Sequence, residues 1–131
     1  MIRKVATWNE RASEILHDAL GPDEKEIAAD VDAGIAELFF VGDDTAFVTR
    51  IEGEALIVCC YQGRDLRTVA KSIYLAAQRA KLSLIQFHTR RLGMIRLLQE
   101  FSPELIGQYF IFSVGVKDGK PITQHDATTA E

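Results

Sequence analysis

Three short strand-like segments at residues 38–41, 45–51 and 55–61 are joined only by tight turns, which narrows the possible folds sharply. The segments are rich in β-branched and aromatic residues, and the turns between them contain Gly42 and Gly53 beside acidic residues. Turns this short connect antiparallel strands, because a parallel connection needs a crossover of a dozen or more residues. The sequence therefore predicts an antiparallel meander in the middle of the chain.

The segment that follows the meander has helical periodicity over residues 66–81. Its apolar residues recur every three or four positions on one face: Leu66, Val69, Ala70, Ile73, Tyr74, Ala77 and Ala80. A short, nearly all-apolar strand at 84–88 comes next, which is typical of a buried central position. We therefore expect 84–88 to lie parallel to 55–61 through a right-handed crossover.

The flanking segments add further elements. A strand is expected at residues 2–7 and a helix after it that stops at Gly21-Pro22. A second helix is expected to carry Ile27, Val31, Ile35 and Leu38, and a later one Met94, Leu97, Leu98 and Phe101. One long strand, 105–116, closes the predicted fold.

These elements predict an α/β (α+β) fold, with a mixed sheet in which an antiparallel meander precedes a βαβ crossover and helices cover both faces. The 131 residues suit one domain over 1–116, followed by a turn and a loose tail over 117–131. Nine residues are expected to form one core: Val58, Leu66, Val69, Ile73, Tyr74, Ile85, Phe87, Leu98 and Phe101.

Charge is distributed unevenly along the chain. Residues 64–96 hold eight Lys and Arg and a single anion, Asp65, for a net charge of +7, and the other residues together carry −11. A basic segment in an acidic chain indicates a local anionic ligand, with a solvated helix face as the alternative. Aromatic residues in this segment fall in core patterns, which argues against nucleic-acid binding.

Membrane and metal sites are not expected. No apolar run reaches the roughly 20 residues that cross a bilayer, and no signal peptide follows the first basic residues, so a cytoplasmic protein is expected. The three histidines are far apart, and Cys59 and Cys60 are adjacent within an apolar run. This spacing suits neither a zinc site nor a disulfide framework. Both cysteines are expected to pack as small apolar side chains rather than to act as nucleophiles.

The order strand, helix, helix, three-strand meander, helix, strand, helix, strand resembles the GNAT superfamily of N-acyltransferases over roughly residues 1–116. Residues 2–10 look like that family's opening strand and helix start, and residues 97–103 look like its late helix and turn. The resemblance implies transfer of an acetyl or other acyl group from acyl-CoA to an amine. It implies that the pyrophosphate of acetyl-CoA binds where the third meander strand meets the next helix, whose N-terminal N–H groups suit an anion.

The residues that match this cofactor loop are Gln62, Gly63, Arg64, Asp65, Leu66 and Arg67. Gln62 stands where the family's Gln or Arg opens the loop, Gly63 allows close approach of the backbone, and the two arginines add charge. The family pattern, Gln/Arg-x-x-Gly-x-Gly/Ala, is met only in part, because Asp65 and Arg67 stand where Gly or Ala is expected. If Asp65 caps the helix, its carboxylate occupies N–H groups that a phosphate needs.

The resemblance also implies catalytic groups at two strand ends. His88 and Tyr61 match positions beside the notch where the family's strands separate around the acyl group. A hydrogen-bonded histidine and a packing tyrosine are the alternatives. The family's tyrosine that protonates the departing thiolate is matched by Leu98, which carries no proton to donate. Glu52 and Glu54, the candidates for the base, lie in a turn and are expected to be solvated acids.

Three functions are open on the sequence alone. The first is an N-acyltransferase with acetyl-CoA as co-substrate and an unknown amine as acceptor. The second is a relative that has lost catalysis and serves as a binding or structural accessory, as short, motif-poor members in phage and prophage genomes do. The third is a nucleic-acid binder that uses residues 64–96. The oligomeric state is open, with a homodimer among the options.

Overall fold

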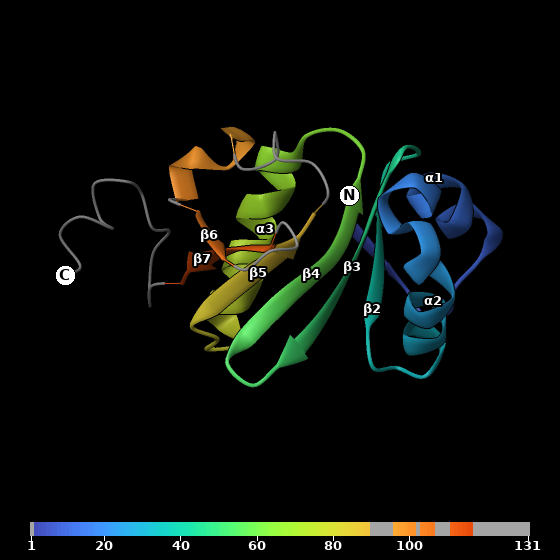
Figure 1. Cartoon of the computed structure of the whole chain (residues 1–131), viewed down its shortest axis with the longest axis horizontal. Helices are drawn as coiled ribbons and strands as arrows, with labels where there is room; N and C mark the ends of the chain where they lie inside the picture. Colours follow the sequence, from blue (N-terminus) through green and yellow to red (C-terminus); the bar gives the residue numbers. More distant parts are fainter. Residues whose placement is uncertain (1, 90–95, 102, 107–110, 117–131) are drawn as a thin grey trace, which may run out of the picture. The chain divides into compact units, whose positions relative to one another are not determined.

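The computed structural model describes residues 2–89, 96–101, 103–106 and 111–116 (Figure 1). By their contacts these residues form two compact units. Unit 1 comprises Met1–Ile51 and Val58–Arg64, and unit 2 comprises Glu52–Ile57 and Asp65–Glu131. Strand β4 (Ala55–Gln62) begins in unit 2 and ends in unit 1. The single domain over 1–116 stays a prediction, and the tail 117–131 lies outside the described residues.

The strands of unit 1 form the predicted antiparallel meander. Strand β1 (Ile2–Val5) pairs antiparallel with β2 (Glu37–Val41), which pairs antiparallel with β3 (Thr45–Glu52). The order within this unit is β1-β2-β3-β4. Strands β2, β3 and β4 match the predicted segments to within one residue at each end, because the glycine-containing turns between them stop the strands.

Two helices cover one face of these strands (Figure 1). Helix α1 (Glu10–Leu20) begins after Asn9, whose side chain accepts a hydrogen bond from the Ala12 N–H at 2.9 Å. The 3₁₀ turn η1 (Gly21–Asp23) then leads into α2 (Glu24–Asp32). The buried side chains between helices and strands form one apolar cluster: Ala12, Leu16, Leu20, Ile27, Val31, Ala36, Leu38, Phe40, Ala46, Val48 and Cys60.

The second helix is shorter than predicted. It ends at Asp32, Ile35 is 63 % exposed, and Leu38 belongs to β2 rather than to the helix. Gly34 adopts a φ of +78°, which glycine reaches without steric cost and which a continuing helix cannot accommodate. The four-residue apolar spacing therefore continued past the helix end by coincidence.

Unit 2 contains the βαβ crossover. Helix α3 (Leu66–Arg79) follows β4 and leads to β5 (Leu84–His88). The N–H of Ser83 donates to the carbonyl of Glu54 at 3.0 Å. Since these residues immediately precede β5 and β4, the two neighbouring strands start at the same end, as a parallel pair requires. The handedness of the crossover stays a prediction.

The end of the chain departs from the prediction. The expected long strand 105–116 is two strands, β6 (Glu104–Ile106) and β7 (Ile111–Gly115), which pair antiparallel with each other. Strand β7 also pairs antiparallel with β5, so the order within unit 2 is β4-β5-β7-β6. Gly107 follows β6, and a glycine inside a strand pattern is a sign of a turn or bulge that the prediction passed over.

The apolar face of α3 is buried as predicted from Leu66 to Ala77, but Ala80 follows the end of the helix and is exposed. The later helical segment is buried only in part. All nine predicted core residues are buried; whether they form a single core stays a prediction. The Tyr74 ring lies 5.7 Å from that of Phe101, in the 3₁₀ turn η2 (Gln99–Phe101). Leu97, predicted for the buried face, is 52 % exposed, so this part of the prediction is wrong. Met94 lies outside the described residues.

Two global features bear on function. Within the described part of the chain, no helix is long and apolar enough to span a membrane. Among the same residues, His, Cys, Asp and Glu form no group of three or more that could bind a metal ion.

Candidate functional site

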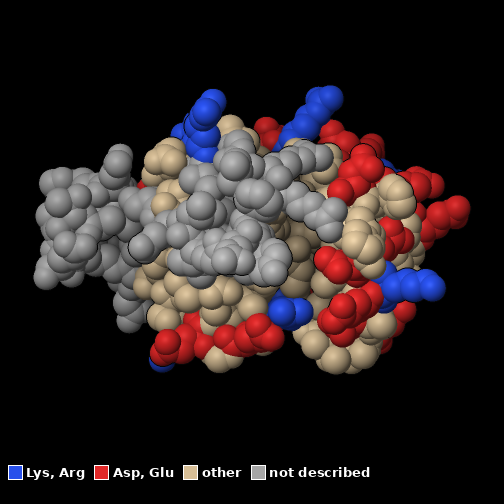
Figure 2. Space-filling model, viewed as in Figure 1, with Lys and Arg blue, Asp and Glu red and all other residues tan. Residues whose placement is uncertain are grey.

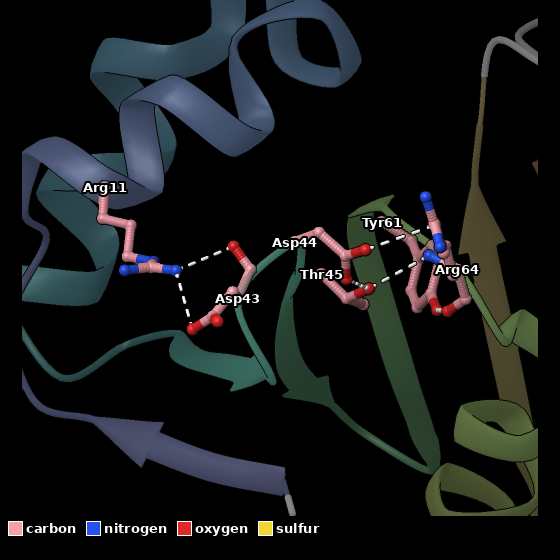
Figure 3. Close-up of polar contacts among 6 residues, drawn as sticks. All are labelled: Arg11, Asp43, Asp44, Thr45, Tyr61 and Arg64. Atoms are coloured by element: carbon pink, nitrogen blue, oxygen red, sulfur yellow. Dashed lines mark hydrogen bonds and ion pairs between the residues drawn. The ribbon is translucent and has the colours of Figure 1, made fainter.

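The predicted cofactor segment 62–67 crosses from unit 1 to unit 2 after Arg64. In unit 1 the peptide groups of Arg64 are held on both sides (Figure 3). Its N–H donates to Thr45 Oγ1 at 3.0 Å, and its carbonyl accepts a hydrogen bond from the Tyr61 hydroxyl at 2.5 Å. The Thr45 hydroxyl donates in turn to Asp44 Oδ1 at 2.9 Å.

Gly63 makes this arrangement possible. A Cβ at this position would lie 2.1 Å from Thr45 Oγ1 and 2.6 Å from Thr45 Cα, closer than any side chain tolerates. Its φ of +139° also lies in the region that favours glycine. Gly63 therefore lies against Thr45, at the start of β3, and the close approach to a phosphate stays a prediction.

The Arg64 side chain forms an ion pair at the surface. Its Nε lies 3.3 Å from Asp44 Oδ2, and the side chain is 85 % exposed. The neighbouring Asp43 forms a similar pair with Arg11 of α1 at 3.2 Å (Figure 3). Exposed pairs of this kind contribute about 0–1 kcal/mol each, so an incoming phosphate can displace the carboxylate.

In unit 2 the N-terminus of α3 carries no carboxylate cap. Asp65 adopts the left-handed conformation, with φ 57° and ψ 38°, and its side chain makes no capping hydrogen bond. Its carbonyl accepts the first helical bond, from the Val69 N–H at 3.0 Å. The possibility that the Asp65 carboxylate caps the helix is therefore not realised, since a capping side chain needs an extended rather than a left-handed backbone. The Leu66 side chain is buried, which limits Leu66 to backbone contacts with a ligand.

The two cations on the first turns of α3 share one carboxylate. Arg67 Nε lies 3.1 Å from Glu100 Oε1, and Lys71 Nζ lies 3.7 Å from Glu100 Oε2. Both side chains remain more than half exposed.

The two predicted catalytic residues differ in their surroundings. Tyr61 is only 6 % exposed, its ring lies 6.0 Å from that of Phe47, and its hydroxyl donates to Arg64. These contacts match the packing alternative. His88 ends β5 in unit 2, half-buried and opposite Ile111 in the strand register. Catalytic roles for both residues stay predictions.

The other residues weighed for chemistry are buried or lie in an exposed turn. Leu98, which the resemblance matches to the family's tyrosine, is fully buried. Burial, with a smaller effect from the neighbouring Cys59, raises the pKa of the Cys60 thiol far above its usual range, which keeps the thiol protonated. Glu52 and Glu54 are exposed at the turn between β3 and β4, as predicted.

Three residues of this region were missed in the sequence: Asp44, Thr45 and Glu100. Asp44 was interpreted only as part of a turn, Thr45 only as the first residue of a strand and Glu100 only as part of a late helix. The contacts of Thr45 and Glu100 join residues 19 and 33 positions apart, respectively, and no local pattern predicts such pairings.

Comparison with known proteins gives a fold match only. No family model and no curated protein matches the sequence. Among solved structures, the chain is similar to the ribosomal-protein-S18-alanine N-acetyltransferase from Escherichia coli, with a TM-score of 0.65 and 9 % identity over 92 % of this chain and 97 % of that one. The chain is also similar to an agmatine N-acetyltransferase mutant in its apo form, again with a TM-score of 0.65. The identity is 11 %, over 88 % of this chain and 98 % of that one. A Bacillus subtilis acetyltransferase in complex with CoA is similar with a TM-score of 0.56. The identity is 12 %, over 88 % of this chain and 97 % of that one.

Proposed function

We propose that this chain, which has the fold of the GNAT N-acetyltransferases, transfers an acyl group from acyl-CoA to an amine. The observation that most directly supports this function is the N-terminus of α3. This 14-residue helix begins without a side-chain cap and without an acidic residue in its first turn. Unsatisfied N–H groups and the positive end of the helix dipole suit the pyrophosphate of CoA.

The proposed cofactor site uses residues 62–67, with acetyl-CoA as the first candidate among acyl-CoA donors. The N–H groups of Asp65, Leu66 and Arg67 would bind phosphate oxygens, and the side chains of Arg64 and Arg67 would supply charge. Both arginines are paired with carboxylates at the surface, so binding would exchange Asp44 and Glu100 for phosphate.

For the chemistry, we assign the proton-accepting role to His88 rather than to Tyr61. The Tyr61 hydroxyl already donates a hydrogen bond to the Arg64 carbonyl, whereas an imidazole can accept the proton that the amine loses. The amine nitrogen would attack the acyl carbonyl carbon, the carbon–sulfur bond would break and CoA would leave as the thiolate. Leu98 cannot protonate that thiolate, so water or another group would supply its proton.

A cationic acceptor is the class to test first. Residues 1–50 contain eleven Asp and Glu and five Lys and Arg. Figure 2 shows acidic side chains gathered over α1 and α2 of unit 1. A surface of this kind attracts polyamines, aminoglycosides or lysine side chains over a distance of about 10 Å at moderate salt.

Cofactor binding is tested by thermal unfolding with and without acetyl-CoA. A ligand that binds only the folded state stabilises it by about 2.7 kcal/mol at a hundredfold excess over Kd, so the melting temperature should rise clearly. The double variant Arg64→Glu, Arg67→Glu should abolish the rise without unfolding the protein, because both side chains are exposed. The matched control, Arg79→Glu with Lys81→Glu, makes the same charge change at the other end of α3 and should keep the rise.

Turnover is tested by thiol release from acetyl-CoA with a panel of amines. His88→Ala should slow thiol release and leave the melting shift nearly intact. Binding without turnover would favour the alternative, a catalytically degenerate accessory protein. Leu98 supports this alternative because leucine cannot protonate the departing thiolate. No melting shift at millimolar acetyl-CoA would overturn the proposed function.

A further inference from the structure

The Arg64 peptide is fixed by two buried side chains of unit 1. Thr45 is 2 % exposed and Tyr61 is 6 % exposed, and each contributes one hydrogen bond to that peptide (Figure 3). Loss of a hydrogen bond at a buried hydroxyl is costly, so both side chains favour the conformation in which each pairs with Arg64. Asp44 reinforces the arrangement because it accepts from Thr45 and pairs with the Arg64 side chain.

This arrangement determines which N–H groups are available to a ligand. The Arg64 N–H is directed at Thr45 and cannot donate to a phosphate at the same time. The next residues in the chain are Asp65, Leu66 and Arg67, and the Asp65 side chain leaves their N–H groups uncapped. Along the segment, the N–H of Arg64 is therefore bound to Thr45, and the N–H groups of the next three residues can bind an anion.

We infer that Thr45 is a positioning residue for the proposed cofactor site. Its hydroxyl holds the Arg64 peptide before any ligand is bound, which orders the part of the loop that leads into the proposed site and leaves the Arg64 N–H unavailable to a phosphate. A loop ordered in advance loses less conformational freedom on binding, which strengthens affinity. This inference rests on the proposed function and adds a residue from β3 to it.

The experiment compares two substitutions at position 45 by calorimetric titration with CoA. Thr45→Val keeps the shape of the side chain but removes the hydroxyl, and should raise the Kd for CoA about fivefold, the factor that one hydrogen bond typically contributes. Thr45→Ser keeps the hydroxyl and should stay within about twofold of the unaltered protein. The matched control is Thr49→Val, a buried threonine of the same strand, which should leave the Kd unchanged.

Hydrogen exchange of the Arg64 amide provides a readout without ligand. The amide should be protected in the unaltered protein and in Thr45→Ser, and should exchange faster in Thr45→Val. Tyr61→Phe removes the hydrogen bond to the Arg64 carbonyl and keeps the ring. It gives a second test through the Kd should Thr45→Val not fold, with the same direction of change expected.

The outcomes separate this inference from the function on which it rests. If the unaltered protein binds CoA and the Kd of Thr45→Val is unchanged, the positioning role is wrong and the proposed function stands. The same holds for Tyr61→Phe where Thr45→Val does not fold. If the unaltered protein does not bind CoA, the proposed function is overturned and the positioning role with it.

Discussion

Glu100 accepts a hydrogen bond from Arg67, with 3.1 Å between its Oε1 and the arginine Nε, and its other oxygen lies 3.7 Å from Lys71 Nζ. One carboxylate is thereby shared between two cations a turn apart on α3. The charge of +7 counted over residues 64–96 therefore overstates the field at the start of this helix, because Glu100 lies outside that range. A phosphate that binds Arg67 has to compete with Glu100.

Removing this competitor should strengthen cofactor binding. We expect Glu100→Gln to lower the Kd for CoA ~2- to 5-fold at low salt, the factor that corresponds to an exposed ion pair of ~0.5–1 kcal/mol. The gain should shrink as salt is added, since screening weakens both the pair and the phosphate contact. Glu26→Gln, an exposed glutamate of α2, is the control for the change in net charge. Equal affinities of Glu100→Gln and the unaltered protein at low salt would show that Glu100 does not compete.

The parts of the fold predicted well are those with strong local patterns. The strands at 38–41, 45–51 and 55–61 and the buried face of α3 follow from period-two and period-3.6 spacing between clear turn residues. The errors lie where a local pattern continues past a break. Ile35 extended the apolar spacing of α2 beyond Gly34, and Gly107 was passed over within 105–116.

The candidate site was predicted as a segment but not as a set of contacts. Chain order and charge identified residues 62–67, since a glycine turn, a helix start and two arginines are adjacent in the sequence. The partners of those residues come from distant positions: Thr45 for the Arg64 peptide and Glu100 for the Arg67 side chain. The left-handed backbone of Asp65, which frees the helix start from its carboxylate, has no sequence pattern of its own.

Cys60 should be unreactive in the folded protein. Burial raises the pKa of its thiol, and the thiolate is the species that attacks an alkylating reagent. We expect iodoacetamide at mildly alkaline pH to leave Cys60 unmodified in native protein and to modify it fully in urea, as measured by peptide mass spectrometry. The half-buried Cys59 should react at an intermediate rate and serves as the internal comparison. Native Cys60 that reacts as fast as in urea would contradict the buried position.

Ile73 should be a major contributor to the stability of unit 2. Its side chain is 5 % exposed on the apolar face of α3, so Ile73→Ala removes buried methyl groups and should cost about 2–5 kcal/mol. Leu75 on the same helix is 42 % exposed, and Leu75→Ala should cost less than about 1 kcal/mol. Urea unfolding followed by circular dichroism gives both values. Similar losses in the two variants would mean that the buried face of α3 is assigned wrongly.

Gly63→Ala should damage both stability and the proposed cofactor site. The added Cβ would lie 2.1 Å from Thr45 Oγ1, so the chain has to move away from β3 and the hydrogen bond between Thr45 and Arg64 is lost. Overpacking of this kind costs about 1–3 kcal/mol.

Gly42→Ala is the control: its φ of +61° carries the strain of a left-handed backbone, about 1–2 kcal/mol, but nothing lies within 4 Å of the new Cβ. We therefore expect urea unfolding to show a larger loss for Gly63→Ala, and titration to show weaker CoA binding in that variant alone. Equal losses of stability and equal Kd values in the two variants would mean that contact with Thr45 is not the reason for a glycine at position 63.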